Sequence, residues 1–397
     1  MTPRRAILCL ALGETIVWAG LYYLFPALLP RWEAFEGWPK TTLTAAFAGA
    51  VIMSAVFSPL AGRLIDRGYG PQTIAGAAVL GAVLVALLPL AASPWMFAAI
   101  WLGIGVAMSA CLYEPCFSLI TRTRGKEARR GITLVTLVAG FAGTLSFPVN
   151  HAVSEAVNWQ AATLTFAVLI AGVAAPLLWF GSRALERQWQ EGADAAASAA
   201  AVERKHARPA GYILRHPAFW FLALGFALLA VNHGMVLNHL LPILHDRGTH
   251  PDTAVLAASM IGPMQVAGRL AMMAAERHVS SRGITTACFL AVIVATLCLV
   301  GAAAVPGLLV AFVILQGSGY GVTSIMKPVA IREILGDRDF GVVNGAMAVP
   351  YLIGFALAPF FGSLLWELGG YEFALLVVAG LSTLGLIGYR LAARRAV

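Results

Sequence analysis

Charged residues are scarce in this chain, and their scarcity excludes an ordinary soluble domain. Of its 397 residues, 12% are Asp, Glu, Lys or Arg and 59% are hydrophobic, whereas about a quarter of the residues of a soluble domain are charged. The mean hydropathy is +0.80. Apolar stretches of about 20 residues, each long enough to cross a bilayer as a helix, recur along the whole chain. We therefore predict an all-α membrane protein.

Cysteine is also rare, and the sequence lacks the spacings of nucleotide and metal sites. The five cysteines lie within predicted helices and are odd in number, which argues against a disulfide framework, and none pairs with histidine at metal-site spacing. The sequence contains no Gly-x-x-x-x-Gly-Lys-Ser/Thr phosphate loop, so it gives no sign of transport driven by ATP. The glycine run of residues 317–321 lies within a predicted helix, where close helix packing explains it. We expect no cofactor and no metal.

The apolar stretches predict twelve membrane helices, divided into two groups of six by one polar interruption. This interruption, residues 183–214, is rich in alanine and charge, and we interpret it as a partly helical cytoplasmic linker. It would join an N-terminal six-helix bundle, residues 1–182, to a C-terminal one, residues 215–397. The predicted helices cover residues 7–30, 41–61, 72–92, 95–120, 131–155, 160–182, 217–243, 253–275, 284–305, 307–330, 341–366 and 371–393.

Short motifs repeat at an offset of about half the chain. Gly62-Arg63-Leu64 follows an apolar stretch and recurs as Gly268-Arg269-Leu270, and Glu114-Pro115 in the fourth predicted helix is mirrored by Lys327-Pro328 in the tenth. These correspondences indicate two pseudo-symmetric halves. Parallel repeats of six helices, with a binding site at their interface, describe one large transporter architecture.

The distribution of positive charge predicts the orientation in the membrane. Most of the 27 Lys and Arg residues lie in segments on one side, and the loops on the other side hold only Arg31, Lys40 and Arg247. By the positive-inside rule both termini are cytoplasmic in a multi-pass protein of the cytoplasmic (inner) membrane. The net charge of +8 therefore reflects topology and the lipid bilayer, and does not indicate a nucleic-acid partner.

The polar turn at residues 62–70 resembles the signature between helices 2 and 3 of the major facilitator superfamily, with its Gly, Asp, Arg and late Gly matching. The resemblance extends over the chain through the helix number, the long middle loop and the repeats. It implies two six-helix bundles that transport by alternating access. A carboxylate here can accept hydrogen bonds from a neighbouring Arg or from helix N-terminal amides, which would stabilise one packing of the helices. The candidate gating residues are Gly62, Arg63, Asp66, Arg67 and Gly70.

Within that superfamily the chain is similar to the monocarboxylate-porter branch. The similarity rests on residues 22–26 in the first predicted helix, Gly37-Trp38, and Ser58-Pro59. It implies that Arg269, in the eighth helix, binds the carboxylate of the substrate. The branch often carries an acid four residues earlier and, in animal members, a lysine after the first-helix Phe-Pro. Those positions are Gln265 and Ala27 here.

Four ionisable residues lie within predicted membrane helices. Each costs at least ~2.5 kcal/mol to insert, so each should face a cavity or a partner. Arg269 and Lys327 are candidates for binding an anionic substrate, and Glu114 and Glu14 are candidates for carrying a coupling proton. The alternative is that these charges form ion pairs between the bundles and close the inner gate.

Further candidates for the substrate pocket are aromatic or polar residues of the first and seventh helices. Trp18, Tyr22 and Tyr23 could line the pocket, although aromatic residues at helical spacing more often serve packing. His233, preceded by Asn232, lies deep beside a glycine where the helix can unwind, and histidine titrates near neutral pH.

We predict a secondary active transporter that works as a monomer and moves a small, monocarboxylate-like organic anion with protons. The alternative is an exporter, or a carrier of zwitterionic or larger solutes that are drug-like, amino-acid-like or siderophore-like. The fifth helix lacks the Gly-x-x-x-Gly-Pro element of drug–proton antiporters, which lowers the efflux interpretation. A membrane enzyme is disfavoured because no catalytic constellation is visible, and a transport-derived sensor because no signalling domain is attached.

Overall fold

The described part of the structure is entirely helical. A computed structural model describes residues 1–195 and 210–396, and every regular element in these two ranges is a helix. Ten of the described helices are long and apolar enough to cross a membrane. Large apolar side chains such as Val168 and Phe360 are about 70% exposed on their surfaces, as expected where helices face lipid.

The helices account for the twelve predicted segments. One of the ten spanning helices, α17 (Phe340–Arg394), loses helical backbone angles at Gly369 and Gly370 and therefore consists of two consecutive helices. A further helix of 25 residues, α14 (Pro251–Ala275), covers the eighth predicted segment. The predicted fold class, a twelve-helix all-α membrane protein, is confirmed.

The remaining elements follow one another along the chain. They are α1 (Pro3–Val17), η1 (Trp18–Tyr22), α2 (Leu24–Glu36), α3 (Lys40–Asp66), α4 (Gly70–Leu87), η2 (Leu88–Leu90), α5 (Pro94–Cys111), α6 (Tyr113–Arg124), η3 (Gly125–Glu127), α7 (Ala128–Ala139), α8 (Ala142–Ala156), α9 (Trp159–Leu169), η4 (Ile170–Ala174), α10 (Ala175–Ala195), α12 (Ala210–Ile213), α13 (Pro217–Asp246), α15 (Ser281–Gly301) and α16 (Leu308–Leu335).

The chain forms two compact units. Unit 1 comprises Met1–Ala210 together with Asp337–Val349, and unit 2 comprises Gly211–Gly336 together with Pro350–Val397. The first turns of α17 therefore pack in unit 1, although the rest of that helix belongs to unit 2. The predicted linker over 183–214 lies within α10 and α12 at its ends, and residues 196–209 lie outside the described residues. The predicted domain limits stay a prediction.

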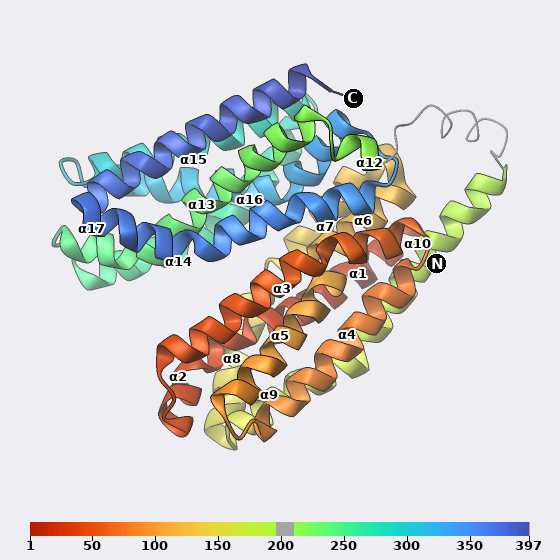
Figure 1. Cartoon of the computed structure of the whole chain (residues 1–397), viewed down its shortest axis with the longest axis horizontal. Helices are drawn as coiled ribbons and strands as arrows, with labels where there is room; N and C mark the ends of the chain where they lie inside the picture. The colour runs from red at the N-terminus through yellow and green to blue at the C-terminus, as the bar shows by residue number, and fades with distance from the viewer. Residues whose placement is uncertain (196–209, 397) are drawn as a thin grey trace. The chain divides into compact units, whose positions relative to one another are not determined.

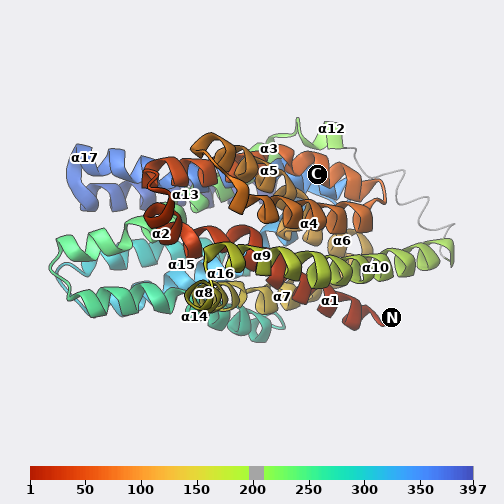
Figure 2. The same ribbon diagram turned by 90° about the horizontal axis from the view of Figure 1, so that it is seen from below.

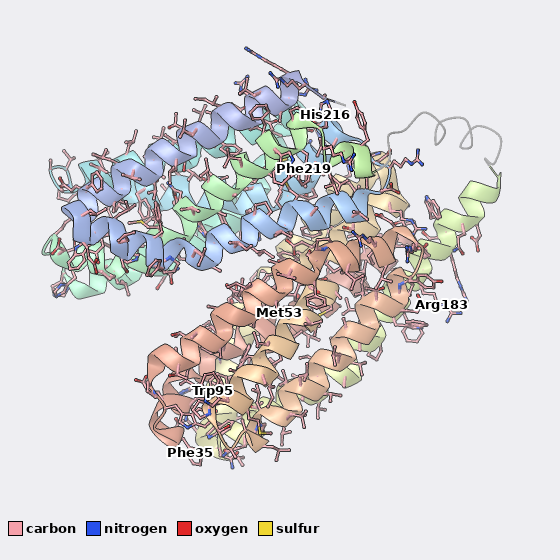
Figure 3. All side chains as sticks on the ribbon, viewed as in Figure 1. Phe35, Met53, Trp95, Arg183, His216 and Phe219 are labelled. Atoms are coloured by element: carbon pink, nitrogen blue, oxygen red, sulfur yellow. The ribbon has the colours of Figure 1, made fainter. Side chains whose placement is uncertain are left out.

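In unit 1, α3, α4 and α5 run side by side (Figures 1 and 2). Their close approach depends on glycine, because a Cβ at Gly105 of α5 would lie 2.1 Å from the carbonyl oxygen of Ala50 in α3. Beyond this contact Phe25, Trp32 and Trp101 are buried and pack ring against ring, with centroids 5.1 to 6.1 Å apart. At the same end of the unit Trp95, labelled in Figure 3, is 85% exposed.

In unit 2, α16 packs along both α14 and α15 (Figure 2). The glycine run of α16 makes this possible, because a Cβ at Gly317 would lie 2.5 Å from the Cβ of Met264 in α14. A Cβ at Gly319 would lie 2.9 Å from the Cβ of Ala291 in α15. The run therefore serves helix packing, as its position within an apolar helix indicated.

Candidate functional site

The signature turn contacts the beginning of α17. The carboxylate of Asp66, at the end of α3, accepts hydrogen bonds from the backbone N–H groups of Gly341 and Val342, at 2.8 Å each. The first N–H groups of a helix have no partner within the helix, and the helix dipole makes that end positive. Asp66 therefore caps the first turn of α17, a segment at the far end of the sequence that folds within unit 1.

The backbones of α3 and α17 touch beside this cap. A Cβ at Gly62 would lie 1.9 Å from the carbonyl oxygen of Gly341, and one at Gly341 would lie 2.3 Å from the carbonyl oxygen of Gly62. One turn further along, a Cβ at Gly345 would lie 2.5 Å from the oxygen of Ser58. These glycines are required because the helices approach too closely for any side chain.

The other signature residues stand around the same turn. The α3 helix continues through Asp66, so Gly62 and Arg63 lie in its last turns and not in the loop that the sequence suggested, because a helix need not end where its apolar run ends. Arg63 and Arg67 are exposed. Gly70 begins α4, where a Cβ would lie 2.8 Å from Leu119 of α6.

Two contacts at this end of unit 1 were not anticipated from the sequence. Arg122 of α6 donates to the carbonyl oxygen of Ile65 at 2.7 Å and forms a salt bridge of 2.8 Å with Glu186 of α10. Asn344 of α17 is buried and donates to the carbonyl oxygen of Glu114 at 3.2 Å and to the Ser118 hydroxyl at 3.1 Å. In the sequence Arg122 is one of many positive residues that indicate topology, and the one signal for Asn344 is a lone amide in an apolar helix.

The two acidic candidates lie together in unit 1. Glu14 of α1 is fully buried and lies close to Cys116, Trp18 and Glu114. Glu114 lies in the first turn of α6, directly after the extended backbone of Leu112 separates α5 from α6. A carboxylate is favourable in the first turn of a helix because of the helix dipole. The structure therefore places two interacting carboxyl groups at a break between membrane helices.

The aromatic candidates of the first helix surround these acids. Trp18 and Tyr22 begin and end the π-helical turn η1, and the Trp18 ring lies 4.7 Å from that of Tyr113 and 6.4 Å from that of Tyr23. All four side chains are half-buried. Single π-helical turns inside α-helices are frequent at functional sites. Unit 1 therefore presents a half-buried aromatic face beside Glu14 and Glu114.

A second cluster lies in unit 2 and contains Lys327. Its ammonium nitrogen lies 4.1 Å from the centroid of the Tyr351 ring, and the Tyr351 hydroxyl lies 2.6 Å from that of Tyr320. Tyr320 stacks on His233 with centroids 3.3 Å apart, and the His233 Nδ1 lies 3.2 Å from the Gln316 amide. Lys327, His233 and Gln316 are buried. We call these five residues, drawn from α13, α16 and α17, the lysine–tyrosine cluster.

The two remaining candidates of unit 2 have their own partners. Arg269 of α14 is 5% exposed, and its Nε donates to the carbonyl oxygen of Gly321 in α16 at 3.0 Å. Asn232 donates to the Thr296 hydroxyl at 3.0 Å and to the carbonyl oxygen of Val378 at 3.3 Å, joining α13 to α15 and α17. Asn232 therefore stands apart from its neighbour His233, and its role in substrate binding stays a prediction.

The four intramembrane charges are segregated by unit. Both acids, Glu14 and Glu114, lie in unit 1, and both cations, Arg269 and Lys327, lie in unit 2. Trp18 and Tyr113 lie beside the acids, and Tyr351 and Tyr320 lie beside Lys327. No group of three or more His, Cys, Asp or Glu that could hold a metal ion occurs in residues 1–195 and 210–396.

Comparisons with known proteins point to one family. A family model described as the Major Facilitator Superfamily matches residues 10–304. No curated protein sequence matches the chain.

Several solved structures share the fold. The human organic anion transporter MFSD10 (TETRAN) is 17% identical, with a TM-score of 0.71 over 98% of this chain and 100% of that one. A bacterial homologue of the iron transporter ferroportin, solved in an outward-facing state with soaked iron, is 14% identical, with a TM-score of 0.74 over 100% of both chains. The proton:xylose symporter XylE is 13% identical, with a TM-score of 0.70 over 97% of this chain and 94% of that one. At these identities the likeness concerns the fold alone.

Proposed function

Because the chain belongs to the Major Facilitator Superfamily, we propose that it is a secondary active transporter that moves a small organic anion across the cytoplasmic membrane with protons. Membership of the family points to a transporter and not to an enzyme. The observation that carries the choice of substrate is the burial of two cations, Arg269 and Lys327, in membrane helices of one unit. We take the monomer as the working unit.

An organic carboxylate fits these cations chemically. An ammonium or guanidinium group in a membrane helix is costly, and an anion that reaches it lowers this cost. The lysine–tyrosine cluster adds two hydroxyl groups that can donate to carboxylate oxygens, and its rings can pack against an apolar body. The monocarboxylate-porter resemblance and the organic anion transporter among the structural neighbours agree with this substrate class.

The acids of unit 1 suit proton coupling. A carboxyl group that is neutral when buried and ionised when it meets water can bind a proton on one side of the membrane and release it on the other. Glu14 is fully buried beside Glu114, so the two can share this task. In this proposal the substrate binds the cations and the proton binds the acids.

The second candidate function is the transport of a zwitterionic solute, and the presence of acids as well as cations in the predicted membrane helices favours it. The acids Glu14 and Glu114 suit an ammonium group chemically, as Arg269 and Lys327 suit a carboxylate. A zwitterion would then occupy the acids that, for a simple anion, carry the proton.

Uptake into proteoliposomes distinguishes these proposals. The purified chain is reconstituted and offered labelled monocarboxylates and labelled amino acids, with and without an inward proton gradient. We expect saturable uptake of a carboxylate that the gradient raises above the external concentration. Uptake of amino acids alone would replace the anion proposal by the zwitterion one, and the absence of any uptake difference from empty liposomes would contradict both.

Replacing Glu114 with glutamine should separate exchange from accumulation. Glu114→Gln keeps the shape of the side chain but cannot carry a proton, so we expect exchange of internal for external substrate to continue while uptake driven by the gradient falls to the level without it. Glu155→Gln is the matched control, because that acid of the same unit is exposed and paired with Arg31 at 2.6 Å. Accumulation by Glu114→Gln and by Glu14→Gln at the wild-type level would remove both acids from the coupling mechanism.

The predicted orientation can be tested by labelling introduced cysteines. In a background without the five native cysteines, Trp95→Cys should react with an impermeant maleimide added to intact cells, because the exposed Trp95 begins the fourth predicted helix on the external side. Ala197→Cys, in the predicted cytoplasmic linker, should react only after the membrane is opened. The reverse pattern would place the termini outside the cell.

A further inference from the structure

A pocket lined by arginines lies at one end of unit 2 and takes no part in the transport proposal. It has a volume of about 320 Å³ between the first turns of α15 and the last turns of α17. Tyr389 of α17 is buried, and its hydroxyl donates to the backbone oxygen of Arg282 at 3.5 Å, which joins the two walls. The lining residues are Arg282, Thr286, Tyr389, Arg390, Ala393 and Arg394.

Unit 1 has a corresponding pocket of about 290 Å³. It lies between the first turn of α4 and the later turns of α10, and Arg183, labelled in Figure 3, lines it together with Arg187, Trp179 and Glu186. The guanidinium group of Arg183 lies 5.5 Å from the centroid of the Trp179 ring. Tryptophan and arginine together are typical of the membrane–water interface.

The internal repeat relates the two pockets. Each is formed by the third and sixth membrane helices of its unit, and each contains two arginines four residues apart, Arg183 and Arg187 in α10 and Arg390 and Arg394 in α17. Residues four apart on a helix lie on one face. In the sequence the second pair follows the first at a distance of about half the chain, as expected for an internal repeat. The same arrangement therefore occurs twice in this molecule, once in each unit.

The pockets differ in charge. No carboxylate lines the unit 2 pocket, whereas Glu186 lines the unit 1 pocket and is paired with Arg122. Within the two described ranges of the chain, none of Arg282, Arg390 and Arg394 has a carboxylate at salt-bridge distance. Glu333 lies near Tyr389 but does not line the pocket. Three positive charges therefore line this cavity, and it should bind anions more strongly than the unit 1 pocket.

Both pockets adjoin the apolar surface that faces lipid. Ile387, three residues before Arg390, is 49% exposed, and Phe180, three residues before Arg183, is 58% exposed. Residues three apart lie on the same helix face, one turn from each other. The arginines therefore lie where an apolar helix surface gives way to a charged one. A water-soluble anion would contact only the arginines. A phospholipid could place its phosphate on the arginines and its acyl chains against the neighbouring apolar turn.

We propose that the unit 2 pocket binds the phosphodiester headgroup of an anionic phospholipid in the leaflet at the termini of the chain, which the charge distribution predicts to be cytoplasmic. Arg390 and Arg394 donate to the phosphate oxygens, and Arg282 and the Thr286 hydroxyl complete the site. The acyl chains lie along Ile387. The unit 1 pocket is the equivalent, weaker site, in which Arg183 and Arg187 play the same part.

Native mass spectrometry of the purified full chain tests the site. The protein in detergent is titrated with dioleoyl phosphatidylglycerol, and in parallel with dioleoyl phosphatidylcholine, which has the same chains and phosphate but no net charge. We expect tighter binding of phosphatidylglycerol by the wild type. The double variant Arg390→Gln/Arg394→Gln should weaken that binding on the order of tenfold, because it removes two positive charges that attract the anionic headgroup. Arg390→Lys/Arg394→Lys should retain most of it.

Arg395→Gln is the matched control. This arginine follows Arg394 but lies over the Phe221 ring at 5.3 Å and does not line the pocket. An equal loss in Arg395→Gln would show unspecific attraction and overturn the proposal, as would equal binding of the two lipids. Displacement of phosphatidylglycerol by millimolar inorganic phosphate would instead identify a site for soluble phosphate. The melting temperature of each variant, measured without lipid, identifies a variant that fails to fold, and for such a variant Arg282→Gln replaces the double change.

Discussion

Replacing Arg269 with lysine should lower the affinity for the transported anion by about a hundredfold. Arginine offers a planar fork that binds both oxygens of a carboxylate, and lysine offers a single point charge. Losing charged hydrogen bonds in a desolvated site costs a few kcal/mol, and each 1.4 kcal/mol is a factor of ten in binding. The measurement is the dissociation constant of the purified variant for the carboxylate identified in proteoliposomes.

The structure provides an alternative role for Arg269 that the same variants can separate. Its Nε donates to the carbonyl oxygen of Gly321, so the side chain also braces α14 against α16. If bracing is its only role, Arg269→Ala should lower the melting temperature and leave the affinity unchanged. Arg277→Lys is the matched control, because Arg277 lies just beyond the end of α14 and is exposed. Wild-type affinity in Arg269→Ala would transfer the anion site to Lys327.

The lysine–tyrosine cluster could not have been assembled from the sequence. The sequence indicates Lys327 and His233, because an ionisable residue in an apolar helix is conspicuous. It does not indicate Tyr351 and Gln316, because it does not say which faces of α13, α16 and α17 meet. Only the packing shows that the Lys327 ammonium lies over one tyrosine ring and that His233 stacks on another.

Helix number was predictable, whereas the breaks within helices were not. Apolar runs of about 20 residues identify a membrane span whatever its neighbours do. The predicted single helix over 95–120 is two helices, α5 and α6, separated by the extended backbone of Leu112. Pro115 was the available signal, because proline disfavours helical backbone in the residue before it and removes a helix hydrogen bond. The π-helical turn at Trp18–Tyr22 has no comparable signal.

The sequence predicts which type of group bonds to the signature turn, but not which residues supply it. The sequence indicated that the Asp66 carboxylate would accept hydrogen bonds from an arginine or from the amides of a helix N-terminus. The structure gives it the amides of α17, and Arg122 binds the neighbouring Ile65 carbonyl instead. Nothing in a single sequence pairs residue 66 with residues 341 and 342.

Replacing Asp66 with asparagine should open the contact between α3 and the start of α17 and slow transport at least tenfold. The amide keeps one oxygen acceptor but puts an N–H₂ donor against a backbone N–H donor, and it loses the attraction of a carboxylate for the positive helix end. Charged hydrogen bonds of this kind contribute about 1.5–3 kcal/mol. A loss of that size lowers the population of the closed contact relative to the open one by a factor of ten or more.

The reactivity of a cysteine placed at Ser118, a buried residue in contact with α17, measures this opening directly. Ser118 is 2% exposed and receives a hydrogen bond from Asn344, so Ser118→Cys, in a background without native cysteines, should react slowly with a maleimide in inside-out vesicles. Adding Asp66→Asn should accelerate the reaction, while binding of substrate to the purified protein changes less than the transport rate. Gly62→Ala should act in the same direction, because its Cβ would lie 1.9 Å from the oxygen of Gly341.

Asp339→Asn is the matched control for the gate. This neighbouring carboxylate accepts a hydrogen bond from the backbone N–H of Ala210 at 3.0 Å, whereas the amides of Gly341 and Val342 donate to Asp66. Asparagine also tolerates the positive φ of 51° at this position. We expect labelling of Ser118→Cys and the transport rate to stay at their reference values in Asp339→Asn. If Asp66→Asn behaves in the same way, the cap on α17 joins two helices without controlling access, and the gating step must be sought elsewhere in the chain.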